Sequence, residues 1–280
     1  MTVTLCLMSA VTYAGGAVLQ ERVAAAVEVH AYAPLRRPLW WAAVALNGLG
    51  AALHVVALAF GPLSLVQPLG ALTIVFALPM AAALVGGQIG ATAWYGAVMA
   101  SVGLAGLLAL TGTDSSKQAL SGSESLLVGL VASGTVAALT AAALLVRRYP
   151  VARAVLLAGA AGVASGIASV FVKTIAVDFT RAGLWAQLPN LLTIAVFAVA
   201  GLLLSQASFR GVGLAAPLAT VTVMNSVAAA TVGVTLFEES FRYGATGTAA
   251  ALGCGVIAAG GVILLTTQRF RHASGTAAVC

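Results

Sequence analysis

A few polar side chains interrupt the long apolar stretches of this sequence, and their types could support binding chemistry. Asn47 and His54 are seven residues apart, a spacing that places both on one face of a helix. Asn225 lies in the middle of another apolar stretch, with Thr222 one turn before it. Amides and hydroxyls both donate and accept hydrogen bonds, and a histidine also titrates near neutral pH. We expect these groups to bind a solute; the alternative is that they hydrogen-bond neighbouring backbone carbonyls.

The segment PLSLVQPLGALTIVFALP, residues 62–79, adds prolines to an apolar stretch. Its polar side chains and the prolines beside them are Gln67, Thr73, Pro68 and Pro79. A proline inside a helix removes one hydrogen bond, at a cost of about 3 kcal/mol or more. Carbonyls left without a partner are tolerated at membrane depth only where protein or a wet cavity satisfies them. The segment therefore predicts a bent helix that contributes to a solute site, with a static kink as the alternative.

Other kinds of chemistry have little support in the sequence. It contains no set of Ser, His and Asp at plausible depth, no metal-ligand spacing and no phosphate-binding loop. Its three cysteines, Cys6, Cys254 and Cys280, have no paired spacing. We therefore expect no catalytic residue, no metal ligand and no cofactor. All seven acidic residues lie at or beyond the ends of the apolar stretches, which disfavours both magnesium binding and carboxylate-based proton coupling at mid-membrane.

The composition is typical of an integral membrane protein. Of the 280 residues, 61% are hydrophobic and 7% are charged, against about 25% charged residues in soluble domains. The apolar stretches are continuous for about twenty residues, which favours membrane helices over the alternating strands of a barrel. The net charge of +6 bears on orientation, and we expect no nucleic-acid site. The sequence therefore predicts an all-α, polytopic membrane helix bundle in contact with the lipid bilayer.

Charged or Gly/Pro-rich breaks divide the chain into nine predicted spans: 2–20, 39–60, 63–86, 91–111, 125–146, 152–174, 188–208, 213–236 and 244–267. The Lys and Arg residues are unequal on the two sides of the membrane. One side has Arg22, Arg36, Arg37, Arg147, Arg148, Arg153, Arg210, Arg269 and Arg271; the other has Lys117, Lys173, Arg181 and Arg242. This asymmetry predicts an N-terminus outside and a C-terminus in the cytoplasm, with residues 269–280 as a disordered cytoplasmic tail. The arginine-rich composition favours a bacterial inner membrane.

Two parts of the chain resemble each other. PLGALTIV, residues 68–75, is similar to PLATVTVM, residues 217–224, and Pro217 opens the second copy as Pro68 opens the first. Each copy precedes a span that begins Gly-Ala-Thr, at Gly90 in one and at Gly244 in the other. These spans also carry late glycines, Gly103 and Gly106 in the first and Gly260 and Gly261 in the second. The two copies would cross the membrane in opposite directions. We therefore predict inverted repeats, with four helices in residues 1–112, an external linker in 113–124 and five helices in 125–268.

These segments resemble a known family. LHVVALAFGPLSLVQPLGAL and LLSQASFRGVGLAAPLATVTVMNSVAAATVGVTLFEES are similar to the drug/metabolite transporter (EamA-like) superfamily. Residues 62–72 are most similar to its NIPA-type magnesium transporter branch and bacterial relatives. The superfamily usually has ten helices in two repeats of five, whereas the first repeat here has four. GGQIG also stands where the second repeat has the acidic end Glu238-Glu239.

The resemblance implies a secondary transporter of a small solute or metabolite that works by alternating access. A NIPA-type magnesium transporter and a non-transporting membrane scaffold are the alternatives, and an enzyme is not expected. We expect a solute cavity between spans two, three and eight, lined by Asn47, His54, Gln67, Thr73, Thr222 and Asn225. Helix bending or gating is expected at Pro68, Pro79 and Pro217. The oligomeric state stays open, with a homodimer as one option.

Overall fold

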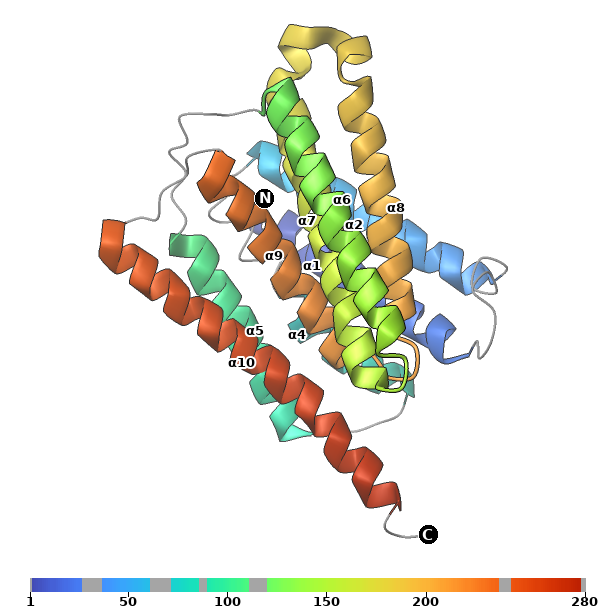
Figure 1. Cartoon of the computed structure of the whole chain (residues 1–280). Coiled ribbons are helices and arrows are strands. Elements are labelled where there is room, and N and C mark those ends of the chain that lie inside the picture. Colours follow the sequence, from blue (N-terminus) through green and yellow to red (C-terminus); the bar gives the residue numbers. More distant parts are fainter. Residues whose placement is uncertain are drawn as a thin grey trace. The chain divides into compact units, whose positions relative to one another are not determined.

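The computed structural model describes residues 2–26, 37–60, 72–85, 90–110, 120–236 and 243–277. All regular secondary structure in these residues is helical (Figure 1). The helices are α1 (Thr2–Ala25), α2 (Pro38–Phe60), α4 (Thr73–Val85), α5 (Ala91–Leu110), α6 (Gly122–Leu145), α7 (Pro150–Ala186), α8 (Leu188–Ser208), α9 (Ala215–Leu236) and α10 (Gly244–Ala277). The predicted all-α fold is confirmed.

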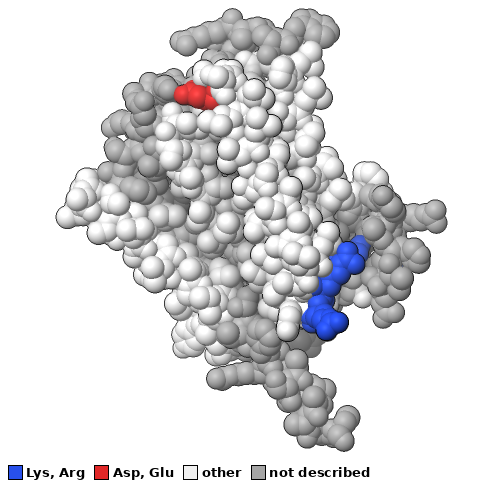
Figure 2. Space-filling model, viewed as in Figure 1, with Lys and Arg blue, Asp and Glu red and all other residues white. Residues whose placement is uncertain are grey.

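Membrane crossing follows from helix length and composition. Among the described residues, seven helices are long and apolar enough to span a bilayer: α1, α2, α6, α7, α8, α9 and α10. The apolar parts of α4 and α5, Thr73–Ala83 and Ala91–Leu107, are shorter. The described surface visible in Figure 2 is mostly uncharged, as lipid contact requires. The chain is therefore a multi-pass membrane protein, and each predicted span overlaps one of the nine helices in the described residues.

Three helices continue beyond their predicted ends: α1 ends at Ala25 rather than at residue 20, and α7 and α10 continue further. The sixth predicted span ends at residue 174, whereas α7 continues to Ala186. The expected disordered tail is wrong for residues 269–277, because α10 continues to Ala277. None of these extensions contains a proline, and each further residue of a formed helix adds a hydrogen bond. Hydropathy marks where a helix leaves the apolar region, and not where the helix ends.

Local sequence accounts for two of the connections. Ser121 begins α6 with a capping box: its hydroxyl accepts from the Glu124 backbone N–H at 3.4 Å, and Glu124 Oε2 accepts from the Ser121 N–H at 2.9 Å. The turn between α8 and α9 contains Gly211 and Gly213, whose φ angles are +71° and +68°. Glycine adopts this left-handed conformation without a steric penalty, so the sequence allows a tight turn there.

Packing divides the chain into two compact units. Unit 1 is residues 1–110, 209–219 and 246–280; unit 2 is residues 111–208 and 220–245. The larger core of unit 1 includes Val18 of α1, Ile74 of α4 and Phe209 from the α8–α9 turn. The core of unit 2 includes Ala132 of α6 and Phe171 of α7. The predicted repeats divide the chain by sequence rather than by packing, so their boundaries and the linker stay predictions.

Candidate functional site

In unit 1, α2 packs against α1 through residues spaced three, four or seven apart. On α1 they are Cys6, Ser9, Tyr13 and Gly16, and on α2 they are Asn47, Gly50 and Ala57. This heptad spacing is typical of helices that pack with a small crossing angle. Ser9 Oγ donates to the Gly50 carbonyl at 2.8 Å, a buried hydrogen bond between the helices. Asn47 and His54 lie seven residues apart in α2, on one face as predicted, and Asn47 packs on α1.

Asn47 has a packing role at this contact. Its side-chain N–H donates to the Ala43 carbonyl of its own helix at 3.0 Å. A Cβ added to Gly16 would lie 2.8 Å from Asn47 Nδ2, so the glycine makes room for the amide. The half-buried His54 lies on the same face, seven residues later. The alternative weighed from the sequence, a structural asparagine, fits these contacts, and solute binding by either residue stays a prediction.

The proline-containing segment is described from residue 72 onward. Thr73 is buried at the first position of α4, and Pro79 lies inside that helix. Gln67 and Pro68 lie outside the described residues. Pro217 is fully buried in the first turn of α9, where backbone N–H groups have no partner within the helix. A proline is therefore tolerated at this position because it lies at the start of the helix, and a bending role for Pro217 stays a prediction.

In unit 2, two glycines bring the backbones of α7 and α9 together beside Asn225. A Cβ added to Gly162 would lie 2.7 Å from the Val221 carbonyl oxygen and 3.0 Å from the Asn225 nitrogen. One turn later, a Cβ on Gly166 would lie 2.5 Å from the Asn225 carbonyl oxygen and 3.1 Å from Ala228. Because the contacts advance along both helices together, α7 and α9 run parallel at this crossing.

Asn225 has a buried amide oxygen without a hydrogen-bond partner in the part of the chain that the structure describes. The oxygen is Oδ1, and the residue lies at the middle of α9. A buried acceptor without a partner costs about 1–3 kcal/mol, so such a group requires an explanation beyond packing. Thr222, one turn earlier, is half-buried, and its carbonyl accepts from Ser226 Oγ at 3.3 Å. Asn225 is therefore the strongest candidate for contact with a solute.

The predicted solute cavity combines residues of both units. Asn47, His54 and Thr73 belong to unit 1, whereas Thr222 and Asn225 belong to unit 2. Since the structure describes each unit by itself, the cavity between spans two, three and eight stays a prediction.

A reciprocal pair of glycine contacts joins α5 and α10 within unit 1. A Cβ on Gly103 would lie 2.5 Å from Ala258 N and 2.6 Å from the Cys254 carbonyl oxygen. A Cβ on Gly261 would lie 2.5 Å from the backbone N of the α5 alanine and 2.6 Å from a carbonyl oxygen one turn earlier, those of Ala100 and Gly96. The glycines are evident in the sequence, but their pairing was not predicted from it. A sequence signal for the pairing exists, because Gly96, Ala100 and Gly103 have the same spacing as Cys254, Ala258 and Gly261.

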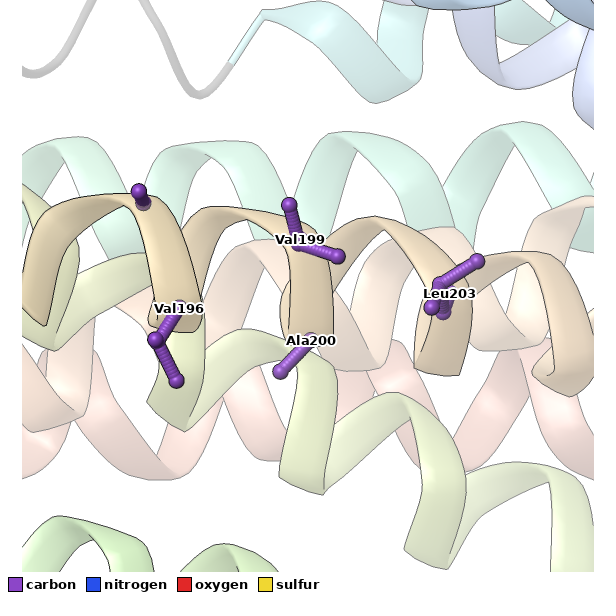
Figure 3. Close-up of a pocket in the computed structure, with 5 residues that line it drawn as sticks. Val196, Val199, Ala200 and Leu203 are labelled. Atoms are coloured by element: carbon purple, nitrogen blue, oxygen red, sulfur yellow. The ribbon is translucent and has the colours of Figure 1, made fainter. Parts of the chain in front are cut away.

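A shallow depression on α8 is entirely apolar. It is lined by Ala195, Val196, Val199, Ala200 and Leu203, which form one stripe along the helix (Figure 3). Phe197 and Gly201 of the same helix are buried instead. No lining residue has a polar side chain, so the depression suits a lipid chain better than a polar solute.

Among the residues that the structure describes, no group of three or more His, Cys, Asp or Glu side chains lies close enough to hold a metal ion. Comparisons of the chain with family models, with curated proteins and with solved structures find no match.

Proposed function

We propose that this protein is a secondary transporter that moves a small solute across the membrane by alternating access. The observation that carries the proposal is the α5–α10 pairing. Gly96, Ala100 and Gly103 of α5 correspond in order to Cys254, Ala258 and Gly261 of α10, and exchanging the two sets reproduces the close contacts. Such an exchange is produced by a local two-fold axis that lies perpendicular to the two antiparallel helices. When both helices cross a membrane, such an axis lies in the membrane plane, as in inverted-repeat transporters.

The packing around α1, in the first predicted repeat, and around α7, in the second, supports the same proposal. In unit 1, α1 packs on α2, and a Cβ on Gly50 would lie 3.0 Å from Thr12 Oγ1. In unit 2, α7 packs on α8, and a Cβ on Gly201 would lie 2.8 Å from Ser165 Oγ. Both pairs therefore place a glycine of the later helix against a hydroxyl of the earlier one. In addition, α1 contacts α4 and α7 contacts α9, so the order of neighbours is the same in each unit.

Asn225 is the proposed centre of the solute site. A membrane transporter needs polar groups at mid-membrane that are not already satisfied by the protein, and its Oδ1 is such a group. The α7–α9 crossing beside it consists of close backbone contacts at glycines, where small shifts alter the packing. In this proposal, solute supplies the missing hydrogen-bond donor when the site is occupied.

The family resemblance extends the proposal to the drug/metabolite transporter superfamily, in a bacterial inner membrane with the C-terminus in the cytoplasm. Magnesium is the second candidate solute, because an amide oxygen such as Asn225 Oδ1 can accept a hydrogen bond from the water shell that the ion retains. The low carboxylate content of the spans makes a metabolite the first choice.

Transport in proteoliposomes tests the proposal. The purified chain is reconstituted, and the uptake and efflux of a metabolite panel and of Mg²⁺ are measured against protein-free vesicles. We expect at least one solute to equilibrate faster with protein and to show counterflow when the inside is preloaded with the same solute. Leakage that does not show counterflow would contradict alternating access. A chain that moves none of the panel and does not change its protease sensitivity with any solute would favour the scaffold alternative.

A further inference from the structure

The turn between α6 and α7 contains a group of arginines at the end of a helical hairpin. Arg147 and Arg148 are exposed in the four-residue connection, and Arg153 lies half-buried near the start of α7. The connection is ordered by hydrogen bonds, from Tyr149 N–H to the Val146 carbonyl at 2.9 Å and from Arg153 N–H to the Tyr149 carbonyl at 3.0 Å. In Figure 2, the Lys and Arg side chains on the visible face gather over the end of this hairpin.

Positive charge at this end of the hairpin has no nearby compensation among the described residues of unit 2. Glu124 is at the beginning of α6, and Asp178 is far along α7. At 1.5 Å per residue, each lies about 30 Å or more from the turn along its helix. Arg147 and Arg148 follow the C-terminal end of α6, where positive charge is favourable, but Arg153 lies at the positive N-terminal end of α7, where it is not.

Arg153 also has an unsatisfied donor. Its Nε atom is buried and has no hydrogen-bond partner in the part of unit 2 that the structure describes. A guanidinium prefers planar acceptors with two oxygens, such as a carboxylate or a phosphate, and a buried donor without one is costly. The arginine group at the α6–α7 turn therefore favours the binding of an anion.

The neighbouring residues indicate what kind of molecule carries this anion. Leu145, the last residue of α6, is 87% exposed, and Tyr149 is 68% exposed. Leu145 ends an apolar span, and tyrosine is typical of the boundary between lipid tails and headgroups. Basic groups thus adjoin apolar surface that faces lipid, which fits a molecule with a phosphate at one end and acyl chains at the other.

We infer that the α6–α7 turn binds the headgroup of an anionic phospholipid through Arg147, Arg148 and Arg153. The phosphate accepts from the arginine side chains, and the acyl chains lie along the exposed end of α6. The site concerns the membrane partner of the protein and does not depend on the solute that is transported.

Native mass spectrometry of the full-length protein in detergent tests this inference, with phosphatidylglycerol and phosphatidylcholine of the same acyl chains as probes. We expect tighter binding of phosphatidylglycerol. Taking about fivefold in affinity for each arginine that contacts the headgroup, R147Q/R148Q should weaken phosphatidylglycerol binding by about 25-fold and R153Q by about fivefold. Phosphatidylcholine binding should stay within about twofold of the wild-type value.

The control is R22Q/R37Q, which removes the same charge from a connection predicted to lie on the same side of the membrane. It should change phosphatidylglycerol binding less than about twofold, because in detergent no anionic bilayer surface acts on arginines outside the proposed site. An equal loss in the control would overturn the site, since the effect would then be one of net charge. Equal affinity for the two lipids would also overturn it. If millimolar inorganic phosphate displaces the lipid as well as added phosphatidylglycerol does, the site is a free-phosphate site and the lipid assignment is wrong.

Discussion

Two asparagines in apolar helices have different surroundings in this protein. Asn47 donates to the Ala43 carbonyl and fills the space that Gly16 leaves. Asn225 has a buried Oδ1 without a partner in the described part of the chain, beside the crossing of α7 and α9. The residue type alone does not separate a packing role from a binding role. The hydrogen bonds of each amide do, because an acceptor that is already satisfied offers little to a solute.

Asn225→Leu should reduce transport by about tenfold or more while stability stays the same or rises. The loss follows from removing the hydrogen bond to solute, and the unchanged stability from replacing an unsatisfied polar group by an apolar one of similar size. Initial uptake rates in proteoliposomes and thermal unfolding in detergent measure the two effects. Asn190→Leu is the control, because Asn190 already donates to Gln187 Oε1 at 2.9 Å and lies at the start of α8. Normal transport by the Asn225 variant would remove this residue from the site.

Ser9→Ala should lower the free energy of unfolding by about 1 kcal/mol, since it removes the buried hydrogen bond to the Gly50 carbonyl. Denaturant unfolding in detergent would measure the change. Thr135→Ala is its control, because Thr135 Oγ1 donates to the Val131 carbonyl within α6 and the residue is exposed. The two variants should therefore differ in stability, and equal losses would argue against a stabilising bond between α1 and α2.

At the scale of helices, the glycines fall into two classes. In the first class, an added Cβ atom would lie within 3 Å of backbone atoms of the facing helix; these glycines are Gly103, Gly162, Gly166 and Gly261. In α6 and α10, other glycines have nothing within 4 Å, among them Gly129, Gly134, Gly253 and Gly255. Small residues at crossings let membrane helices approach closely, because dispersion and weak hydrogen bonds depend on short distances. Glycine content alone therefore does not locate a crossing.

Gly103→Ala and Gly261→Ala should each destabilise the protein by about 1–3 kcal/mol, because a methyl group at these positions overlaps backbone atoms of the facing helix. Gly255→Ala, in the same helix as Gly261, should instead be neutral or stabilise by up to about 1 kcal/mol through helix propensity. Thermal unfolding of the three variants in one detergent provides the comparison. The α5–α10 pairing would be contradicted if all three melted at the same temperature.

At the scale of the whole molecule, orientation depends on charges at the ends of helices. Glu124 lies at the beginning of α6, and Arg147 and Arg148 follow its end. Positive residues are retained on the cytoplasmic side of a bacterial membrane, so this hairpin favours the orientation predicted for the whole chain. The direction of the other helices then follows from the number of crossings between them.

Fusions of a phosphatase and of a fluorescent protein to each terminus should place the N-terminus outside the cell and the C-terminus in the cytoplasm. The expectation rests on nine crossings and on the distribution of Lys and Arg. Matching fusions within the α6–α7 turn should report a cytoplasmic location. Both termini on one side would require an even number of crossings and would remove the predicted pairing of four helices with five.

The sequence by itself determined the class of this protein and the helices that the structure shows in the described part of each of the nine apolar stretches. Continuous apolar stretches cannot remain in water and cannot leave their backbone groups unpaired in lipid, so helices follow from composition and length. Repeated strings also predict that α4 and α9 are related, with Thr73 and Thr222 at matching positions, and this relation stays a prediction. Helix ends were less predictable: α7 and α10 continue past the apolar residues because hydrogen bonding within a helix does not require apolar side chains.

Only the tertiary structure decided which faces of these helices meet. Apolar helices have almost no hydrophobic difference between their faces, so periodicity could not tell that Gly103 faces Ala258 or that Asn47 faces Gly16. The difference between Asn47 and Asn225 likewise depends on neighbours distant in the sequence. In lipid, helix association is driven by close packing and individual hydrogen bonds, and both are properties of matched surfaces rather than of single stretches of sequence.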